Sequence, residues 1–289
     1  MPVATLSELT PIFEDETKCN SYLVASNVFY RSWTCSCNSE MKMNVGRSTF
    51  RCTSRTCRRE VSIRKGTLFY GSRLSTSQIL RIAYLWIHKV PKGSMMKMTG
   101  HNSRAISEFC RHFEHLTASA ITEESCIIGG DGIIVEIDEA KLGKRKYHRG
   151  HRVEGVWIVS GIERTPQKRV FAVPVETRDA ETLMSIIRAH VAPGSIVHTD
   201  CWRGYSQLSS EFTHLTVNHS LHFVNPQTGT HTNSIEGFWN GLKLQIPPRN
   251  RVRAGMETKL LSVIWRKQNR NDLWTGFLTA LKEIHYEFQ

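Results

Sequence analysis

The stretch Gly132-Ile133-Ile134-Val135-Glu136-Ile137-Asp138-Glu139 decides how this chain is interpreted. It is short, rich in β-branched apolar residues and preceded by Gly129-Gly130, which is the pattern of a strand buried near the middle of a sheet. Asp138 stands at the C-terminal end of that strand. A single acid in such a place is usually a turn or cap residue. A functional role for Asp138 therefore depends on whether other acids lie near it.

A second acid, Asp200, has a similar setting. Pro193-Gly194 predicts a turn, the run from Ser195 to Thr199 predicts a short strand, and Asp200 closes that strand. Because carboxylates at the ends of two strands can converge at one edge of a sheet, we expect Asp138 and Asp200 to lie close together.

A third acid, Glu236, lies in a predicted helix. Apolar residues repeat there at helical spacing, namely Ile235, Phe238, Trp239 and Leu242. Thr232 or Asn233 is the expected N-terminal cap. This helix is expected to carry Glu236 toward the sheet.

The segments between the acids complete a fold. Two more strands, at 154–161 and 168–175, are expected to form an antiparallel meander with the first. Asp179 caps a predicted helix through His190, a second helix is expected at 205–212, and a strand at 214–218 precedes the Glu236 helix. This order is that of the ribonuclease-H-like α/β plan, so we predict a mixed five-stranded sheet with helices. In that plan the acids fall on the first strand, the fourth strand and a late helix, as they do here.

Three converging carboxylates suit a particular chemistry. Mg²⁺ and Mn²⁺ are hard cations that prefer oxygen ligands and keep several waters. Two such ions about 3.5–4 Å apart can hold both the attacking and the leaving oxygen of an in-line displacement at phosphorus. Asp138, Asp200 and Glu236 are therefore the candidate catalytic residues, with two Mg²⁺ or Mn²⁺ ions as their cofactors.

Five stretches of the chain share a pattern with known proteins. They are Val135-Glu136-Ile137-Asp138-Glu139, the basic loop from Lys141 to Arg152, the segment from His198 to Tyr205, Val217-Asn218-His219-Ser220, and the segment from Thr228 to Trp239. Together they resemble the Merlin group of cut-and-paste DNA transposases. They also resemble the related bacterial insertion-sequence transposases that have an ISXO2-like DDE transposase domain. The resemblance covers roughly residues 20 to 285.

This resemblance implies an Asp-Asp-Glu triad at Asp138, Asp200 and Glu236 that cleaves DNA at terminal inverted repeats and joins it to target DNA. It implies Lys243, about two helical turns beyond Glu236, as a DNA contact. A homodimer or a higher oligomer on DNA follows, because two transposon ends must be joined. The resemblance is closest to the eukaryotic branch, which implies action in the nucleus; a bacterial protein would act in the cytoplasm.

A basic loop follows the first strand directly, and a DNA strand that reaches the metal site would meet it. The candidate DNA-binding residues of this loop are Lys141, Lys144, Arg145, Lys146 and Arg149. An exposed hairpin without DNA contact is the alternative.

His231 and Asn233 stand beside the start of the predicted Glu236 helix. We expect them to orient the metal ligands or the scissile phosphate without binding the metal themselves. A second metal site built from His219, His222 and His231 is disfavoured, because their spacing matches no tetrahedral site well.

Four of the eight cysteines form two close pairs, Cys35 with Cys37 and Cys52 with Cys57. Four thiolates are what a tetrahedral structural Zn²⁺ requires, and the metal contributes folding energy to a segment too small for its own core. The first pair has one intervening residue where two are usual in the family. Ordinary reduced thiols are the alternative, and a disulfide framework is not expected in a chain of this length without a secretory signal.

Basic residues are concentrated in one region. The chain carries 38 Lys and Arg against 26 Asp and Glu, a net charge of +12. Fifteen of the basic residues lie between Met41 and His112, where the acids are Glu60 and Glu108. This imbalance is typical of a protein that binds the phosphate backbone of nucleic acid.

The same region contains a helix-turn-helix pattern. Ser75 caps a predicted helix through Lys89, Pro91-Lys92-Gly93 breaks it, and a turn at 94–98 leads to a further helix at 103–116. That last helix presents Arg104 and Arg111 outward, so we expect it to enter the major groove of DNA. A purely structural three-helix unit is the alternative.

The predicted domain order is a helical segment at 1–30, a zinc-ribbon-like segment at 31–70, the helix-turn-helix region at 71–125, and the catalytic domain with C-terminal helices at 126–289. The sequence has no run of eighteen apolar residues and no cleavable signal, so neither membrane insertion nor export is expected. A DNA transposase is the predicted function. The alternatives are a ribonuclease-H-like nuclease without strand transfer and a domesticated DNA-binding protein that does not cut.

Overall fold

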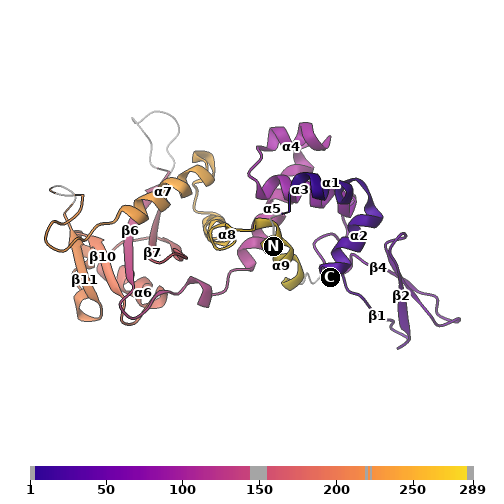
Figure 1. Ribbon diagram of the computed structural model, residues 1–289, viewed down its shortest axis with the longest axis horizontal. Helices are drawn as coiled ribbons and strands as arrows, with labels where there is room; N and C mark the ends of the chain where they lie inside the picture. The colour runs from indigo at the N-terminus through magenta and orange to yellow at the C-terminus, as the bar shows by residue number, and fades with distance from the viewer. Residues whose placement is uncertain (1–3, 144–154, 219–220, 222, 285–289) are drawn as a thin grey trace. The chain divides into compact units, whose positions relative to one another are not determined.

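The computed structural model describes residues 4–143, 155–218, 221 and 223–284 of the chain (Figure 1). The chain divides into two compact units, one made of Met1–Ala120 with Asn269–Gln289 and the other of Ile121–Gln268. We call them the N-terminal unit and the acidic-site unit.

A five-stranded mixed sheet forms the centre of the acidic-site unit, in the spatial order β11-β10-β6-β7-β8. Strands β6, β7 and β8 pair antiparallel as a meander, whereas β10 runs parallel to β6, and β11 runs parallel to β10. The bounds are β6 Ile134–Leu142, β7 Val156–Glu163, β8 Val170–Val175, β10 Ile196–Asp200 and β11 Thr213–Val217. The predicted mixed five-stranded sheet is confirmed, and two short strands, β5 (Ile128–Gly129) and β9 (Val191–Ala192), pair separately.

Helices cover both faces of this sheet. Helix α6 (Ala180–His190) begins at Asp179, whose Oδ1 accepts the Thr182 N–H at 2.9 Å, so the predicted cap is confirmed. The His190 ring of α6 stacks on Phe171 of β8 at 4.8 Å between ring centroids. Helix α7 (Asn233–Gln245) packs against β6 and β7 (Figure 1), and α8 (Met256–Gln268) packs against β8.

The predicted helix at 205–212 is wrong. Two single 3₁₀ turns occupy this segment, η2 (Arg203–Tyr205) and η3 (Leu208–Ser210). Tyr205 and Leu208 are buried, and the Ser210 hydroxyl donates to the Gln207 carbonyl at 2.7 Å. Serine side chains that bond to nearby backbone groups compete with helical hydrogen bonds, which favours such turns over a continuous helix.

The N-terminal unit combines helices with a small antiparallel sheet. The sheet pairs β1, β2, β3 and β4 in chain order. The elements are α1 (Leu6–Glu14), α2 (Glu16–Ala25), β1 (Trp33–Thr34), β2 (Glu40–Asn44), β3 (Thr49–Cys52), β4 (Glu60–Ser62), α3 (Thr76–Ile87), α4 (Lys92–Thr99), α5 (Ser103–Ser119) and α9 (Leu273–Glu283).

Ser75 caps α3 as predicted, since its hydroxyl accepts the Gln78 N–H at 3.2 Å. The segment predicted as a turn at 94–98 lies inside a helix, α4. Pro91 stands at the start of α4 and Gly100 ends it with a left-handed φ of 75°, and these two residues favour a helix between them.

Helix α9 belongs to the N-terminal unit, whereas the predicted domain order placed it in the catalytic domain at 126–289. Trp274 of α9 is buried against the rings of Phe13 and Tyr84, at 6.0 and 5.5 Å between centroids. Its indole Nε1–H donates to the Tyr22 hydroxyl at 2.8 Å. These aromatic contacts with α1, α2 and α3 place α9 in the N-terminal unit, while α8 stays in the acidic-site unit. None of the helices in the described part of the chain has the length and apolar character required to cross a membrane.

Gly161 in β7 provides a test of the sheet packing. A Cβ atom at this position would lie 2.4 Å from Cε1 of Phe171 in β8. We expect Gly161→Ala to lower the free energy of unfolding by about 1–3 kcal/mol, because the overlap displaces a buried aromatic ring. Urea denaturation checks this, with Gly241→Ala in α7 as the control, since nothing lies within 4 Å of that Cβ position. Equal stability of Gly161→Ala and the wild type would contradict this packing.

Candidate functional site

Asp138 and Asp200 lie on neighbouring strands. Strand β10 runs parallel to β6 with Ile196 opposite Ile134 and His198 opposite Glu136. Continuing this register by two residues places Asp200 beside Asp138, on the same face of the sheet. Burial, followed by the negative charges of Glu139 and Asp200, raises the pKa of Asp138 to about 6.

Hydrogen bonds fix both carboxylates. Asp138 Oδ1 accepts the Glu139 N–H at 2.8 Å, and Asp138 Oδ2 accepts the Trp239 indole N–H at 2.9 Å. Asp200 Oδ1 accepts the Trp202 N–H at 2.9 Å. Each carboxylate oxygen carries a second lone pair, so these bonds leave acceptor capacity for a cation.

Glu236 stands on α7, and its side chain is exposed. Trp239, which contacts Asp138, follows Glu236 by three residues and so lies about one helical turn further along α7. The structure therefore brings Asp138 and Asp200 together and places Glu236 on the adjoining helix. The carboxylates of all three do not form a closed ligand cluster, since among the described residues only four cysteines do so.

Residues on the other face of β6 connect the strand of Asp138 to the segment around Asp200. The side chain of Glu139 is only 4% exposed there, and its carboxylate accepts bonds from Arg178 Nη1 at 2.9 Å and from the Tyr205 hydroxyl at 2.6 Å. The Arg178 guanidinium lies 4.3 Å from the ring of Trp157 and 4.3 Å from that of Trp202. This stack connects the strand of Asp138 to the turn that follows Asp200.

The sequence did not reveal the residue that caps α7. Thr232 or Asn233 was the expected cap, and Thr232 does stand at the N-cap position, but its side chain makes no capping bond. Glu136 on β6 accepts the first backbone N–H groups of α7 instead, and Arg164 pairs with Glu136 at 2.5 Å. The sequence does contain one signal for this role, because Glu136 is an acid inside a strand that is otherwise apolar.

His231 and Asn233 lie beside this cap. Nη2 of Arg164 lies 2.8 Å from His231 Nδ1 and donates to the His231 carbonyl at 2.7 Å. The Asn233 N–H donates to His231 Nδ1 at 3.4 Å. His231 thus joins the segment before α7 to Arg164, and its predicted effect on metal ligands or phosphate stays a prediction.

The predicted DNA-binding residues lie in several places. Lys141 is exposed on the Glu139 side of β6, with Nζ 5.6 Å from the Trp157 ring centroid, and Lys243 is exposed near the end of α7. Arg104 and Arg111 are exposed on α5 and line an open hollow of about 800 Å³, which Glu108 also lines. The other predicted basic residues, Lys144, Arg145, Lys146 and Arg149, lie outside the described residues.

Cys35, Cys37, Cys52 and Cys57 converge in the N-terminal unit, with their sulfur atoms within 4.8 Å of one another. Sγ of Cys35 lies 3.6 Å from that of Cys57, and Sγ of Cys37 lies 3.5 Å from that of Cys52. Hydrogen bonds from the hydroxyl and backbone N–H of Ser39 lower the pKa of Cys37 to about 6, which favours a thiolate at neutral pH. The single residue between Cys35 and Cys37 does not prevent convergence, and the cluster is compatible with a tetrahedral zinc ion.

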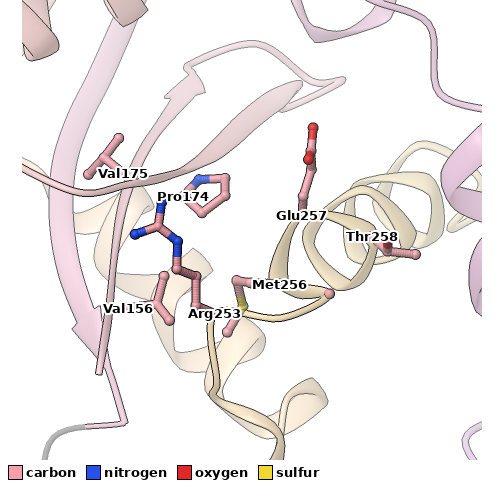
Figure 2. A pocket seen from close by; sticks show the side chains of 8 residues that line it. Val156, Pro174, Val175, Arg253, Met256, Glu257 and Thr258 are labelled. Carbon is pink, nitrogen blue, oxygen red and sulfur yellow. The ribbon is translucent and has the colours of Figure 1, made fainter. Parts of the chain in front are cut away.

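A separate cavity of about 490 Å³ lies between β8 and the start of α8 (Figure 2). Pro174 and Val175 line one side and Met256 the other, and the Arg253 side chain pairs with Glu176. None of the predicted site residues lines this cavity.

The region that carries the three acids is similar to known sequences. Residues 128–247, from β5 to the end of α7, match the ISXO2-like transposase domain. A curated relative from Haemophilus influenzae (strain Rd), described as an uncharacterized transposase-like protein, is 38% identical over 103 residues. The match covers 35% of this chain and 82% of the relative.

The raised pKa of Asp138 predicts a pH-dependent cost to folding. The pKa of Asp138 is higher in the folded protein than in the unfolded chain. Its contribution to the free energy of unfolding is therefore fully present below the pKa of the unfolded chain, near 4. Its contribution is lost as the pH rises through about 6. Asp138→Asn removes the charge and keeps an acceptor for Trp239. Without added Mg²⁺ or Mn²⁺, we expect this variant to be more stable than the wild type by up to about 2 kcal/mol above pH 6. Urea denaturation at several pH values checks this, and a gain equal at pH 4 and pH 7.5 would contradict it.

The cysteine cluster predicts a metal content that can be measured directly. We expect the purified protein to carry one zinc ion per chain and Cys52→Ser to lose it, because three thiolates hold a structural zinc ion far less well than four. Elemental analysis by mass spectrometry checks this. Cys201→Ser is the matched control, since Cys201 is exposed and lies outside the cluster. Equal zinc in all three proteins, or none in the wild type, would rule out the site.

Proposed function

The chain belongs to the ISXO2-like transposase family, and on this premise we propose that it is a DNA transposase that cuts and joins DNA with Asp138, Asp200 and Glu236. The observation that carries the proposal is the parallel register of β6 and β10, which sets Asp200, at the end of β10, beside Asp138 in the middle of β6. The strand order, with an antiparallel meander on one side of β6 and parallel strands on the other, supports a ribonuclease-H-like plan.

The donor set suits divalent cations. Asp138 is partly buried beside the charges of Glu139 and Asp200, and a cation would offset both the cost of burying its charge and the repulsion, which together raise its pKa. Oxygen ligands alone suit Mg²⁺ or Mn²⁺ better than zinc. Asp138, Asp200 and Glu236 would hold these ions, which supply charge stabilisation to an in-line displacement at phosphorus.

The proposed reaction has two displacements. In the first, a water oxygen attacks a phosphodiester at the transposon end; the P–O3′ bond breaks and leaves a free 3′-hydroxyl. In the second, that 3′-hydroxyl attacks a phosphodiester of target DNA, a new P–O bond forms, and a target 3′-hydroxyl is released. Trp239 and the Glu139 N–H hold Asp138, and the Trp202 N–H holds Asp200, so that these carboxylates keep their orientation through both steps.

We assign DNA recognition to the N-terminal unit. Helix α5 presents Arg104 and Arg111 to solvent, as a helix that enters the major groove requires. The cysteine cluster would hold the small sheet β1–β4 together through a structural zinc ion. Two subunits are the smallest assembly that holds both transposon ends.

The assignment is tested by cleavage of supercoiled plasmid that carries the DNA flanking this gene, with Mg²⁺ or Mn²⁺. We expect Asp200→Asn and Glu236→Gln to lower cleavage by about 100-fold or more, because each removes a ligand of an ion that contributes several kcal/mol to the reaction. Asp131→Asn is the matched control, since Asp131 is exposed in the turn before β6. If Asp200→Asn yields the wild-type products at the wild-type rate, the catalytic assignment is wrong.

A further inference from the structure

Glu136 differs from the other acids near the site because it is completely buried and accepts backbone N–H groups of α7. Oε2 accepts the backbone N–H groups of Ser234 at 2.8 Å and Ile235 at 3.0 Å, in the first turn of α7. Oε1 accepts Nε of Arg164 at 2.5 Å. Glu136 precedes Asp138 by two residues in β6, so both side chains lie on the face of the sheet that α7 covers.

We propose that Glu136 is a positioning residue that fixes the start of α7 on β6 and thereby sets where Glu236 stands relative to Asp138 and Asp200. The inference rests on the proposed function, since it takes Glu236 as a metal ligand. The first N–H groups of a helix have no partner within the helix and carry partial positive charge, so a buried carboxylate there is both a hydrogen-bond acceptor and a counter-charge.

Two contacts between α7 and β6 bracket Glu236 in sequence. Ser234 and Ile235 contact Glu136 on one side of it, and Trp239 contacts Asp138 on the other. A helix held at two points about one turn apart cannot slide along or rotate on the strand without breaking one of them. Glu236 lies between these points and therefore has a fixed backbone position, although its side chain is free to turn toward an ion.

Arg164 completes the anchor. It follows β7, pairs with Glu136, and also donates to the carbonyl of His231 at 2.7 Å. This one side chain thus joins the strand acid to the segment that enters α7. A buried carboxylate without its arginine would be an unpaired charge, so loss of Arg164 should weaken the cap that Glu136 provides.

The same geometry argues against Glu136 as a metal ligand. Its side chain has no exposed surface, whereas Asp138 and Asp200 are only partly buried. Its oxygens already accept two backbone N–H groups and a guanidinium, and an ion would have to displace them. Asp138, Asp200 and Glu236 are therefore the candidate ligands, and Glu136 is the anchor.

Manganese affinity and amide hydrogen exchange together test the inference on the full-length protein. Binding of Mn²⁺ alone is followed by electron paramagnetic resonance, and exchange is measured over residues 233–245. We expect Glu136→Gln to weaken Mn²⁺ binding about tenfold or more, as is typical when a residue that orients metal ligands is changed. We also expect at least about tenfold faster exchange in the first turn of α7. Arg164→Lys, a milder change that retains the charge, should move both readouts in the same direction.

Glu163→Gln is the matched control. Glu163 is equally buried and paired with an arginine, Arg169 at 3.0 Å, but it caps no part of α7 and instead accepts the Gly129 N–H. We expect this variant to leave both Mn²⁺ affinity and α7 exchange as in the wild type. If it weakens Mn²⁺ binding as much as Glu136→Gln does, the effect is general destabilisation and the inference is wrong.

The outcomes separate the inference from the proposed function. Unchanged Mn²⁺ affinity or unchanged α7 exchange in Glu136→Gln, with Mn²⁺ bound by the wild type and lost in Asp200→Asn, overturns the anchor and leaves the proposed function standing. A wild type that binds no Mn²⁺, or an Asp200→Asn variant that binds it as the wild type does, overturns the proposed metal site and the inference with it.

Discussion

The parallel pairing of β6 with β10 is the constraint on which the site depends. It sets Asp138 and Asp200 beside each other, and a slip of one residue would turn Asp200 to the opposite face of the sheet. Burial and the negative charges of Glu139 and Asp200 disfavour an ionised Asp138, whose pKa is raised. Apolar neighbours such as Val135, Ile137 and Val197 are fully buried, and their burial offsets this repulsion. The fold therefore holds together an arrangement that its acids alone would oppose.

Short-range signals in the sequence predicted much of this structure. The apolar run ending at Asp138 forms the first half of β6, but the strand continues to Leu142, so Asp138 lies in its middle and not at its predicted C-terminal end. Ser75 and Asp179 cap α3 and α6 as expected, because a cap depends on residues within one turn. The convergence of Asp138 and Asp200 followed from the order of strands and helices. The segment at 205–212 was predicted as a helix but forms two 3₁₀ turns, and the bond from the Ser210 hydroxyl to the Gln207 carbonyl favours such turns.

Long-range contacts explain what the sequence did not reveal. Glu136 caps a helix that begins almost a hundred residues later, and Glu16 does the same for α3 by accepting the N–H groups of Thr76 and Ser77 at 2.9 Å. No local pattern at Thr232 or Ser75 announces such a partner. The position of Glu236 relative to the two aspartates depends on this kind of contact, so the sequence could name the three acids but not the residue that aligns them.

The return of α9 to the N-terminal unit has a consequence for how the chain folds as it is made. Residues 121–268 form a continuous unit that can complete its contacts once they have left the ribosome. The N-terminal unit is discontinuous, and the hydrophobic site that receives Trp274 stays open until α9 has been synthesised. The first unit to begin folding is therefore the last to finish, and its aromatic side chains at Phe13 and Tyr84 are exposed to chaperones or to aggregation for the longest time.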